Sequence, residues 1–299
     1  MTESPLLEQV LAFDCEGARL WGILTRPPAG ASASAPTMAV LVVVGGPQYR
    51  VGSHRQFVLL SRALARRGFP SLRFDYRGMG DSEGSVRSFE GAGADLRAAL
   101  DALCAACPQA GRIVVWGLCD AASAALMFAT ADERVVGVVA VNPWARSAAS
   151  LSATRVKHYY AARLVQREFW SKLLLGGVDL RASLGSFFSD LRGARSSPPQ
   201  GSDASFQTTM ARGLRRFGGR VLLILSGNDL TASEFVQYTD SAAAWRGLLA
   251  DPKLTRVTVA EADHTFSRRI WQDQVEDETI AWLGGLSDAR TCPKQETSE

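Results

Sequence analysis

Short apolar segments alternate with helical segments along most of the chain, and this alternation is the feature that most limits its possible folds. Met38–Val44 and Val135–Val141 are unbroken, β-branched apolar runs, as expected of strands buried on both faces of a sheet. Strands of this kind separated by helices predict a mostly parallel sheet with helices on both faces. Sites in such sheets lie at the carboxyl ends of the strands, so polar residues directly after a strand are the candidates for function.

The expected elements follow from this pattern. The expected strands are Gln9–Asp14 and Arg19–Arg26, which form a hairpin, then Met38–Val44, Ser71–Phe74, Arg112–Trp116, Val135–Val141, Arg220–Leu225 and Leu254–Val259. The expected helices are His54–Arg67, Phe89–Cys104, one that starts at Asp120, Thr231–Ala250 and Arg268–Leu283. Ser53 is the expected N-cap of the first helix, and Thr231 with Glu234 is the expected capping box of a later one.

One long segment departs from the alternation. Residues 144–218 contain helical stretches and a Ser/Pro/Gly-rich loop at Ser196–Ser205, but no run typical of a buried strand. A helical insertion of this size between two core strands predicts a lid over the site. The expected organisation is a core in two parts, residues 1–143 and 219–286, interrupted by the lid at 144–218 and followed by a flexible tail at 287–299.

Composition and charge exclude several classes of protein. Hydrophobic residues make up 46% of the 299 residues and charged residues 21%, which excludes a disordered or fibrous chain. The chain has 33 Lys and Arg against 30 Asp and Glu, a formal charge of +3, without a block of like charges, so we expect no nucleic-acid partner. Met1–Leu11 lacks a basic segment followed by an apolar one, and no apolar run approaches the ~20 residues that span a bilayer. We therefore expect a cytoplasmic protein without a transmembrane segment.

Few residues can carry acid–base or thiol chemistry, because the chain has only three histidines and five cysteines. They are His54, His158, His264, Cys15, Cys104, Cys107, Cys119 and Cys292. An odd number of cysteines at irregular spacing argues against a disulfide framework. Cys104 and Cys107 have no second pair or histidine nearby, so they are expected to be buried structural thiols rather than a zinc or redox site. The histidines lack metal-ligand spacing and no glycine-rich fingerprint opens the first core helix, so neither a metal nor a cofactor is implied.

The strand Arg112–Trp116 runs directly into Gly117–Ala121, which reads Gly-Leu-Cys-Asp-Ala, and then into a helix. This strand–turn–helix context is that of a nucleophile elbow with Cys119 as the nucleophile. The strained turn needs small residues two positions before and after the nucleophile, and the glycine and alanine at its ends meet that demand. The helix N-terminus favours a thiolate at Cys119 and directs the Asp120 N–H toward a developing oxyanion. The alternative is a small buried cysteine in a tight turn.

An acid and a histidine follow two later strands. Asp229 comes after Arg220–Leu225, and His264 comes after Leu254–Val259. In this arrangement His264 takes the thiol proton or pairs with the thiolate and later activates water, while Asp229 fixes the imidazole tautomer. Asp229 has the alternative role of capping the next helix. We prefer it to Asp263 as the acid, because an adjacent residue rarely turns its side chain onto its neighbour's ring.

These residues, together with Val44–Gln48 (Val-Gly-Gly-Pro-Gln) and Arg73–Gly84 (Arg-Phe-Asp-Tyr-Arg-Gly-Met-Gly-Asp-Ser-Glu-Gly), resemble the α/β-hydrolase superfamily. The resemblance covers about Leu20–Pro143 and Arg220–Leu283 and leaves out the expected lid. It implies the α/β-hydrolase fold, with a mostly parallel eight-stranded sheet, helices on both faces and an inserted helical lid. It also implies a nucleophile, acid and base in this chain order.

A narrower resemblance rests on three segments, Gly45–Phe57, Trp116–Ala121 and Asp263–Arg269. They look like those of the exosortase A system-associated hydrolases, which are found beside bacterial exopolysaccharide and PEP-CTERM protein-sorting genes. Members of this family are named hydrolases from their fold, so the resemblance implies a link to exopolysaccharide systems but no defined substrate.

The chain departs from the superfamily at the oxyanion hole. The loop after the first buried strand usually reads His-Gly-x, and the third residue supplies the second oxyanion N–H. Here that residue is Pro47, which has no N–H, so the second donor has to come from the backbone or side chain of Gln48 or is missing. Gly46 in the same loop is a candidate substrate contact.

Two residues after this loop are candidates for substrate binding. His54 lies near the strand-end loop and either contacts substrate at the rim or is a first-turn helix residue bonded locally. Arg50 either holds an anionic substrate group or belongs to a solvated helix start. His158 falls in the expected lid, where we expect it to pack within the lid.

The sequence thus predicts a hydrolase that cleaves an ester, thioester or lactone through an acyl-enzyme on Cys119. The same triad could pass the acyl group to a sugar or lipid alcohol, which would make the protein an acyltransferase. A third hypothesis is a non-catalytic homologue that keeps the fold and the pocket to bind a ligand. In each case the expected partner is a small-molecule, lipid or saccharide acyl compound.

Overall fold

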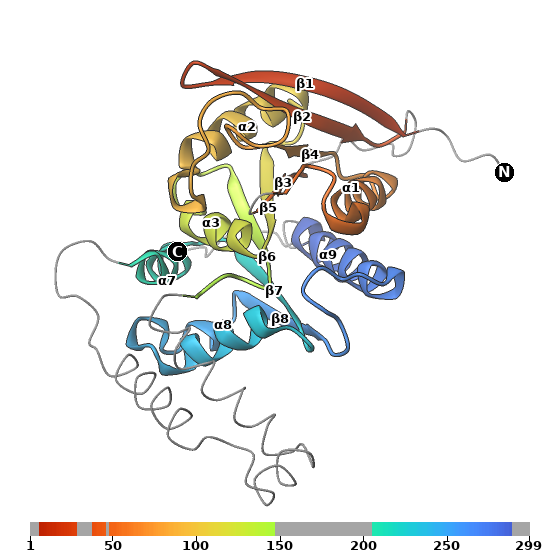
Figure 1. Ribbon diagram of the computed structural model, residues 1–299. Helices are drawn as coiled ribbons and strands as arrows, with labels where there is room; N and C mark the ends of the chain where they lie inside the picture. The colour runs from red at the N-terminus through yellow and green to blue at the C-terminus, as the bar shows by residue number, and fades with distance from the viewer. Residues whose placement is uncertain (1–5, 29–37, 46–47, 147–204, 289–299) are drawn as a thin grey trace, which may run out of the picture.

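The computed structural model describes residues 6–28, 38–45, 48–146 and 205–288 (Figure 1). Within these residues the strands form one eight-stranded sheet in the order β1-β2-β4-β3-β5-β6-β7-β8. The strands are β1 (Leu7–Cys15), β2 (Ala18–Arg26), β3 (Met38–Val43), β4 (Ser71–Phe74), β5 (Arg112–Leu118), β6 (Val135–Val141), β7 (Arg220–Ser226) and β8 (Leu254–Val259). The β1–β2 hairpin and the β2–β4 pair are antiparallel, and all pairs from β4 to β8 are parallel. The mostly parallel sheet predicted from the strand pattern is therefore confirmed.

Helices cover both faces of the sheet (Figure 1). The α-helices are α1 (Gln56–Arg66), α2 (Gly93–Ala106), α3 (Asp120–Phe128), α7 (Phe206–Arg216), α8 (Leu230–Ser241) and α9 (Arg269–Asp288), and the short 3₁₀ helices are η1 (Ser53–Arg55), η2 (Phe89–Gly91), η3 (Ala243–Trp245) and η4 (Leu248–Ala250). Apolar side chains of α1 and α9 form one buried cluster with the sheet, and those of α2, α3, α7 and α8 form the other.

The central strands contribute to both clusters because side chains alternate between the two faces of a strand. In β5, Ile113 and Val115 belong to the cluster under α2 and α3, whereas Val114 and Trp116 belong to the cluster under α1 and α9. All four are buried, so the strand has to be apolar at every position. This is the physical origin of the unbroken apolar runs in the sequence.

The first core helix begins later than predicted. His54 and Arg55 have φ values of 53° and 61°, in the left-handed region, so a right-handed helix cannot run through them. They form η1, and α1 starts at Gln56 with Arg55 in the N-cap position. Ser53 makes no capping hydrogen bond at the start of α1, and that prediction is wrong.

The helix predicted over Thr231–Ala250 is shorter than expected. α8 ends at Ser241 and is followed by η3 and η4. The buried Trp245 of η3 packs against Phe235 of α8, with the two ring centroids 5.4 Å apart. The predicted capping box is also wrong, because Asp229 is the N-cap and the Glu234 carboxylate accepts a hydrogen bond from Arg146 at 2.7 Å.

The segment expected to form a lid ends in a core helix. In α7, Met210 and Leu214 are buried against α3, and Gly213 lies so close to the Leu126 carbonyl that a β-carbon would collide with it. The helical stretches expected in the lid and His158 fall in residues 147–204, outside the described residues. At the C-terminus α9 extends to Asp288, so the expected tail from residue 289 onward also lies outside them.

Candidate active site

Cys119 occupies the turn between β5 and α3. Its φ of 63° and ψ of −124° lie outside the helical and extended regions, and such strain is kept only where the surroundings enforce it. Its N–H donates to the Val141 carbonyl at 2.9 Å, and its carbonyl accepts from the N–H groups of Ala122 and Trp144 at 3.1 Å each. These bonds fix the turn to the end of β6 and to the first turn of α3.

Close backbone approach explains the small residues around Cys119. A β-carbon on Gly117 would lie 2.6 Å from the carbonyl carbon of Ala121. Just after the neighbouring strand β3, a β-carbon on Gly45 would lie 2.8 Å from the Leu118 carbonyl oxygen and closer still to the Asp120 carboxylate. These close backbone contacts are the reason why the turn requires small residues, as inferred from the sequence.

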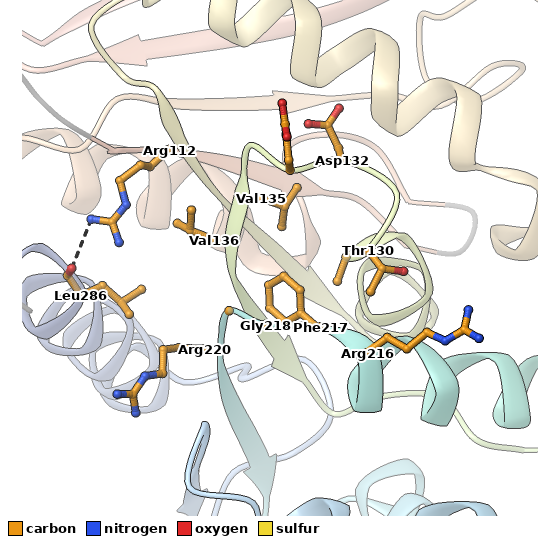
Figure 2. Close-up of a pocket in the computed structure, with 13 residues that line it drawn as sticks. Arg112, Thr130, Asp132, Val135, Val136, Arg216, Phe217, Gly218, Arg220 and Leu286 are labelled. Carbon is orange, nitrogen blue, oxygen red and sulfur yellow. Dashed lines mark hydrogen bonds between the residues drawn. The ribbon is translucent and has the colours of Figure 1, made fainter. Parts of the chain in front are cut away.

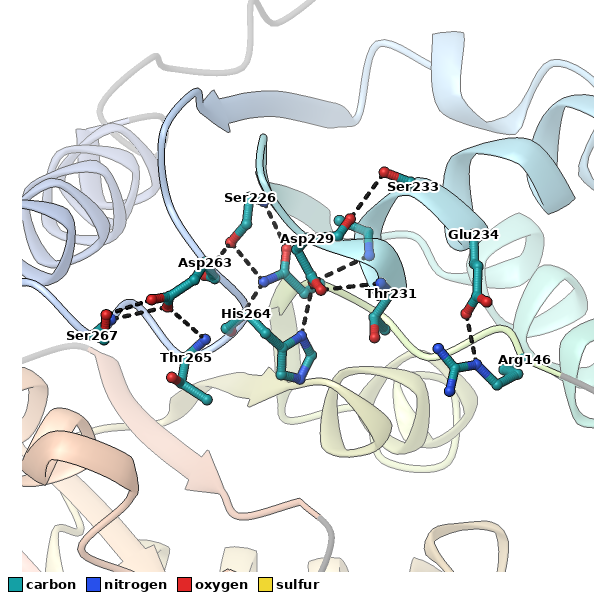
Figure 3. A network of polar contacts seen from close by, with 12 residues as sticks. Arg146, Ser226, Asp229, Thr231, Ser233, Glu234, Asp263, His264, Thr265 and Ser267 are labelled. Carbon is teal, nitrogen blue, oxygen red and sulfur yellow. Dashed lines mark hydrogen bonds and ion pairs between the residues drawn. The ribbon is translucent and has the colours of Figure 1, made fainter. Parts of the chain in front are cut away.

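Asp229 lies at the carboxyl end of β7, where its side chain has two tasks (Figure 3). Oδ1 accepts a hydrogen bond from the Thr231 N–H at 3.0 Å, and Oδ2 accepts one from the Ala232 N–H at 3.2 Å, which caps α8. Oδ2 also lies 2.8 Å from Nδ1 of His264. A carboxylate only accepts, so Nδ1 carries the proton and the ring is held through it. The same carboxylate therefore caps α8 and contacts the His264 ring.

His264 lies in the loop between β8 and α9. Hydrogen bonds to Asp229 and to Cys119 raise the pKa of His264 to about 10, against the opposing effect of burial. Its side chain is 31% exposed, whereas that of Asp229 is 6% exposed, so the ring is reachable and its carboxylate partner is shielded. The structure therefore brings Cys119, His264 and Asp229 together from three separate strand ends.

Asp263, the alternative acid, serves its own loop. Its Oδ1 accepts hydrogen bonds from the Thr265 N–H at 3.2 Å and the Ser267 N–H at 3.0 Å, and Oδ2 accepts from the Ser267 hydroxyl. Burial acts to raise the pKa of Asp263, but these hydrogen bonds and the nearby His54 lower it overall. The Asp263 carboxylate therefore bonds to Thr265 and Ser267 and makes no hydrogen bond to the His264 ring in the described part of the chain.

Asn142 was not predicted from the sequence, yet it ties the histidine loop to the sheet. This fully buried residue follows β6 in a left-handed conformation, with a φ of 44°. Its amide donates to the Ser226 hydroxyl at 2.8 Å and to the His264 carbonyl at 3.3 Å, and its oxygen accepts from the Ser226 N–H at 2.8 Å. An asparagine directly after a buried strand is the signal that could have identified it.

A cavity of about 590 Å³ lies beside the elbow. Gln48 and Asp120, the two predicted oxyanion donors, both line it, together with Tyr76. The side-chain oxygen of Gln48 is buried without a partner in the described part of the chain, and the Asp120 carboxylate accepts from the Ala121 N–H at 2.9 Å. Gly46 and Pro47 lie outside the described residues, so the predicted contact at Gly46 stays a prediction.

The two predicted substrate-binding residues after this loop have different surroundings. The Arg50 guanidinium pairs with the carboxylates of Asp75 and Asp81, and its side chain is only 12% exposed. It braces the loop after β3, and its predicted contact with an anionic substrate group stays a prediction. His54 is exposed in η1 and contributes to the charge around Asp263, which leaves it at the edge of the histidine loop.

A second cavity, of about 600 Å³, lies at the opposite edge of the sheet. It is lined by residues at the amino ends of β5, β6 and β7, among them Arg112, Val135 and Arg220 (Figure 2). This position is remote from Cys119, so the second cavity is no part of the site. Among the described residues, no cluster of three or more His, Cys, Asp or Glu could hold a metal ion, and no helix is long and apolar enough to cross a membrane.

Solved structures share this architecture. An esterase of Pyrococcus furiosus is 17% identical over 94% of this chain and 93% of its own, with a TM-score of 0.61. The esterase domain of a Rhodothermus marinus protein is 18% identical over 93% of this chain and 98% of its own, with a TM-score of 0.57. An α/β serine hydrolase homologue from Coxiella burnetii is 14% identical over 95% and 98%, with a TM-score of 0.53. These likenesses show the fold, and no curated protein matches the chain in sequence.

The sequence itself matches a family model over residues 40–281, which include the elbow, Asp229 and His264. The match begins in β3 and ends within α9, so it spans both parts of the core. The chain belongs to the alpha/beta hydrolase family.

Proposed function

We propose that this hydrolase cleaves an ester or thioester through a covalent acyl-enzyme on Cys119, with His264 as the acid–base and Asp229 as its positioning carboxylate. The observation that carries the proposal is the His264 ring, whose Nδ1 lies 2.8 Å from Oδ2 of Asp229 and whose pKa is raised by both Asp229 and Cys119. A nucleophile, a base and an orienting carboxylate in contact are the constellation that acyl transfer needs. The esterases among the structural neighbours support the same class of reaction.

The raised pKa of His264, about 10, favours a protonated ring next to the sulfur. In the proposed mechanism the Cys119 thiol gives its proton to His264 to form the reactive pair. The sulfur attacks the substrate carbonyl and forms a C–S bond, which turns the carbonyl oxygen into an oxyanion. His264 gives its proton to the leaving alcohol or thiol as the carbonyl–leaving-group bond breaks, and the acyl group stays on Cys119.

The neutral His264 then takes a proton from water as the water oxygen attacks the acyl-enzyme. The C–S bond breaks, the carboxylic acid departs and the proton on His264 restores the ion pair with the thiolate. Asp229 keeps the Nδ1 proton in place in both steps, so the other ring nitrogen faces the reaction. An alcohol in place of water would give acyl transfer, which the same residues can perform.

The oxyanion needs donors that are fixed before the reaction begins. The Asp120 N–H opens α3 directly after the nucleophile, at the positive end of the helix dipole. Gln48, which lines the same cavity, is the proposed second donor, because Pro47 has no N–H to offer.

The resemblance of Gly45–Phe57, Trp116–Ala121 and Asp263–Arg269 to the exosortase A system-associated hydrolases extends the proposal. It associates the enzyme with bacterial exopolysaccharide production and leaves the acyl compound itself to be identified.

Trapping the intermediate tests the proposal. The protein is mixed with p-nitrophenyl esters and acyl-thioesters, and the intact mass and peptide masses are measured. Wild type is expected to carry an acyl group on Cys119 and to release p-nitrophenol. Cys119→Ala is expected to do neither, whereas Cys104→Ala, which removes another free, half-buried thiol, is expected to behave as wild type. Turnover that survives in Cys119→Ala, or no turnover and no adduct with any acyl donor in the wild type, would refute the assignment.

A further inference from the structure

The Tyr76 hydroxyl is a buried polar group that the proposed mechanism does not use. Tyr76 follows β4 and is 6% exposed, and its hydroxyl has no hydrogen-bond partner among the described residues. The residue lines the cavity of about 590 Å³ beside the elbow, together with Asp120 and Gln48. A buried, unpartnered hydroxyl costs free energy, on the order of 1–3 kcal/mol, unless a bound molecule supplies the partner.

Packing alone does not call for a hydroxyl at this position. The Tyr76 ring meets the Phe74 ring edge-on, with centroids 5.5 Å apart, inside the cluster under α2 and α3. A phenylalanine would make the same ring contact without burying an unsatisfied oxygen. The hydroxyl therefore points to a partner that the protein itself does not provide.

The surroundings of the hydroxyl define the chemistry of that partner. Burial raises the pKa of Tyr76 well above its usual value, and the nearby Asp120 and Asp95 carboxylates raise it further, so the hydroxyl stays protonated and can donate. The same carboxylates disfavour an anion close to it. A neutral oxygen, such as a ketone or hydroxyl oxygen, is the acceptor that fits.

Most of the rest of the cavity is suited to hydrocarbon, and Arg87 and Ser88 are the polar exceptions in its lining. Met79, Val86 and Phe89 supply apolar walls, and Gly78 and Gly80 add no side chain to fill the space. A volume of about 590 Å³ falls within the roughly 300–1,000 Å³ that small-molecule sites occupy. An acyl chain of medium length therefore fits the size and the polarity of this cavity.

We propose that the cavity receives the acyl group of the substrate, and that this group is an oxygen-bearing one, a hydroxyacyl or oxoacyl chain whose neutral oxygen accepts a hydrogen bond from Tyr76. This inference rests on the proposed function, because it assigns the acyl side of the same cysteine-dependent reaction. It makes Tyr76 a specificity-determining residue that contacts the substrate away from the bond that is cleaved.

Tyr49 provides a matched control within the same cavity. It also lines the cavity, but its hydroxyl donates to the Asp81 carboxylate at 2.6 Å and already has a partner. Removing the Tyr49 hydroxyl is therefore expected to leave the preference for an oxygen-bearing acyl group unchanged, whereas removing that of Tyr76 abolishes it.

The test compares N-acetylcysteamine thioesters of hexanoic, 3-hydroxyhexanoic, 3-oxohexanoic and 5-oxohexanoic acid. Wild type and Tyr49→Phe are expected to prefer at least one oxygen-bearing substrate over the hexanoyl thioester by about tenfold in kcat/KM. Tyr76→Phe is expected to lose that preference, because its kcat/KM falls further on the oxygen-bearing thioesters than on the hexanoyl thioester. Circular dichroism and the melting temperature establish that each variant is folded.

Three outcomes would overturn the proposal: a wild type that shows no preference, a preference that survives in Tyr76→Phe, or an equal loss on all four substrates. The last would put the hydroxyl at the reacting carbonyl instead. Binding of the same thioesters to Cys119→Ala and to Cys119→Ala/Tyr76→Phe, measured by calorimetry, separates this proposal from the reaction itself. A binding preference that depends on Tyr76 supports the acyl site even if Cys119 proves not to be the nucleophile.

Discussion

The Oδ2 atom of Asp229 accepts a hydrogen bond from Nδ1 of His264 at 2.8 Å, while the same carboxylate caps the first turn of α8. The helix therefore positions the acid, and the acid positions the base. Because the cap bonds come from the N–H groups of Thr231 and Ala232, the carboxylate cannot rotate away from the ring without uncapping the helix.

The double role of Asp229 can be separated by two substitutions. Asp229→Asn keeps a good N-cap but loses the charge that stabilises the imidazolium, so we expect kcat to fall by about 10³–10⁴-fold and stability to fall only by the contribution of the His264 ion pair. Asp229→Ala is expected to lose the same activity and about 1 kcal/mol of unfolding free energy in addition. Steady-state kinetics and urea unfolding of both variants measure the two effects, and an Asp229→Asn enzyme with near wild-type kcat would contradict the assignment.

The raised pKa of His264 predicts a pH-dependent stability. The folded protein holds the proton with a pKa of about 10, against 6.5 for an unperturbed histidine, so protonation favours the folded state. This contribution is fully present below about pH 6.5, decreases as the pH rises and is lost once the pH passes about 10. Urea unfolding at a series of pH values is expected to show this decrease in wild type relative to His264→Gln. Parallel curves for the two proteins across this range would contradict it.

The elements that could be predicted from the sequence are those whose burial or turn geometry follows from their own residue types. In β3, the apolar positions predicted burial on both faces, and the small residues around Cys119 predicted a tight turn. Asp229 and His264 could be paired because parallel strands end at one edge of the sheet. Each of these inferences needs only local sequence and the rule that relates strand ends to sites.

The residues that were missed depend on partners far away in the chain. Asn142 bonds to Ser226 and His264, which are 84 and 122 positions away. The start of α1 at Gln56 is set by left-handed backbone at His54 and Arg55, for which neither residue type gives a signal. The helix α7 was not predicted, although its apolar residues repeat with helical spacing; they pack on α3.

Asn142 is expected to be a positioning residue for His264. Asn142→Ala leaves the Ser226 N–H and the His264 carbonyl without this partner, so we expect a loss of about 1–3 kcal/mol in unfolding free energy. The displaced histidine loop is expected to lower kcat by about tenfold or more at nearly unchanged KM. Asn228→Ala, an exposed asparagine in the adjacent loop, is the control and is expected to match wild type. If Asn142→Ala loses stability but keeps its kcat, the residue acts on the fold alone.

Gly45 is expected to be indispensable to the elbow because the neighbouring backbone lies too close for any side chain at this position. A β-carbon there would lie 2.8 Å from the Leu118 carbonyl oxygen and 2.9 Å from the Ala121 nitrogen, closer than such atoms can approach. Gly45→Ala therefore has to displace β3 or the Cys119 turn, at a cost of about 1–3 kcal/mol in unfolding free energy and with loss of acylation. Gly111→Ala places its β-carbon where no heavy atom lies within 4 Å, so it is expected to leave both quantities unchanged. Urea unfolding and the rate of acyl transfer to Cys119, measured on the two variants side by side, check the prediction. A Gly45→Ala protein as stable and as readily acylated as Gly111→Ala would show that the elbow tolerates a shift of β3.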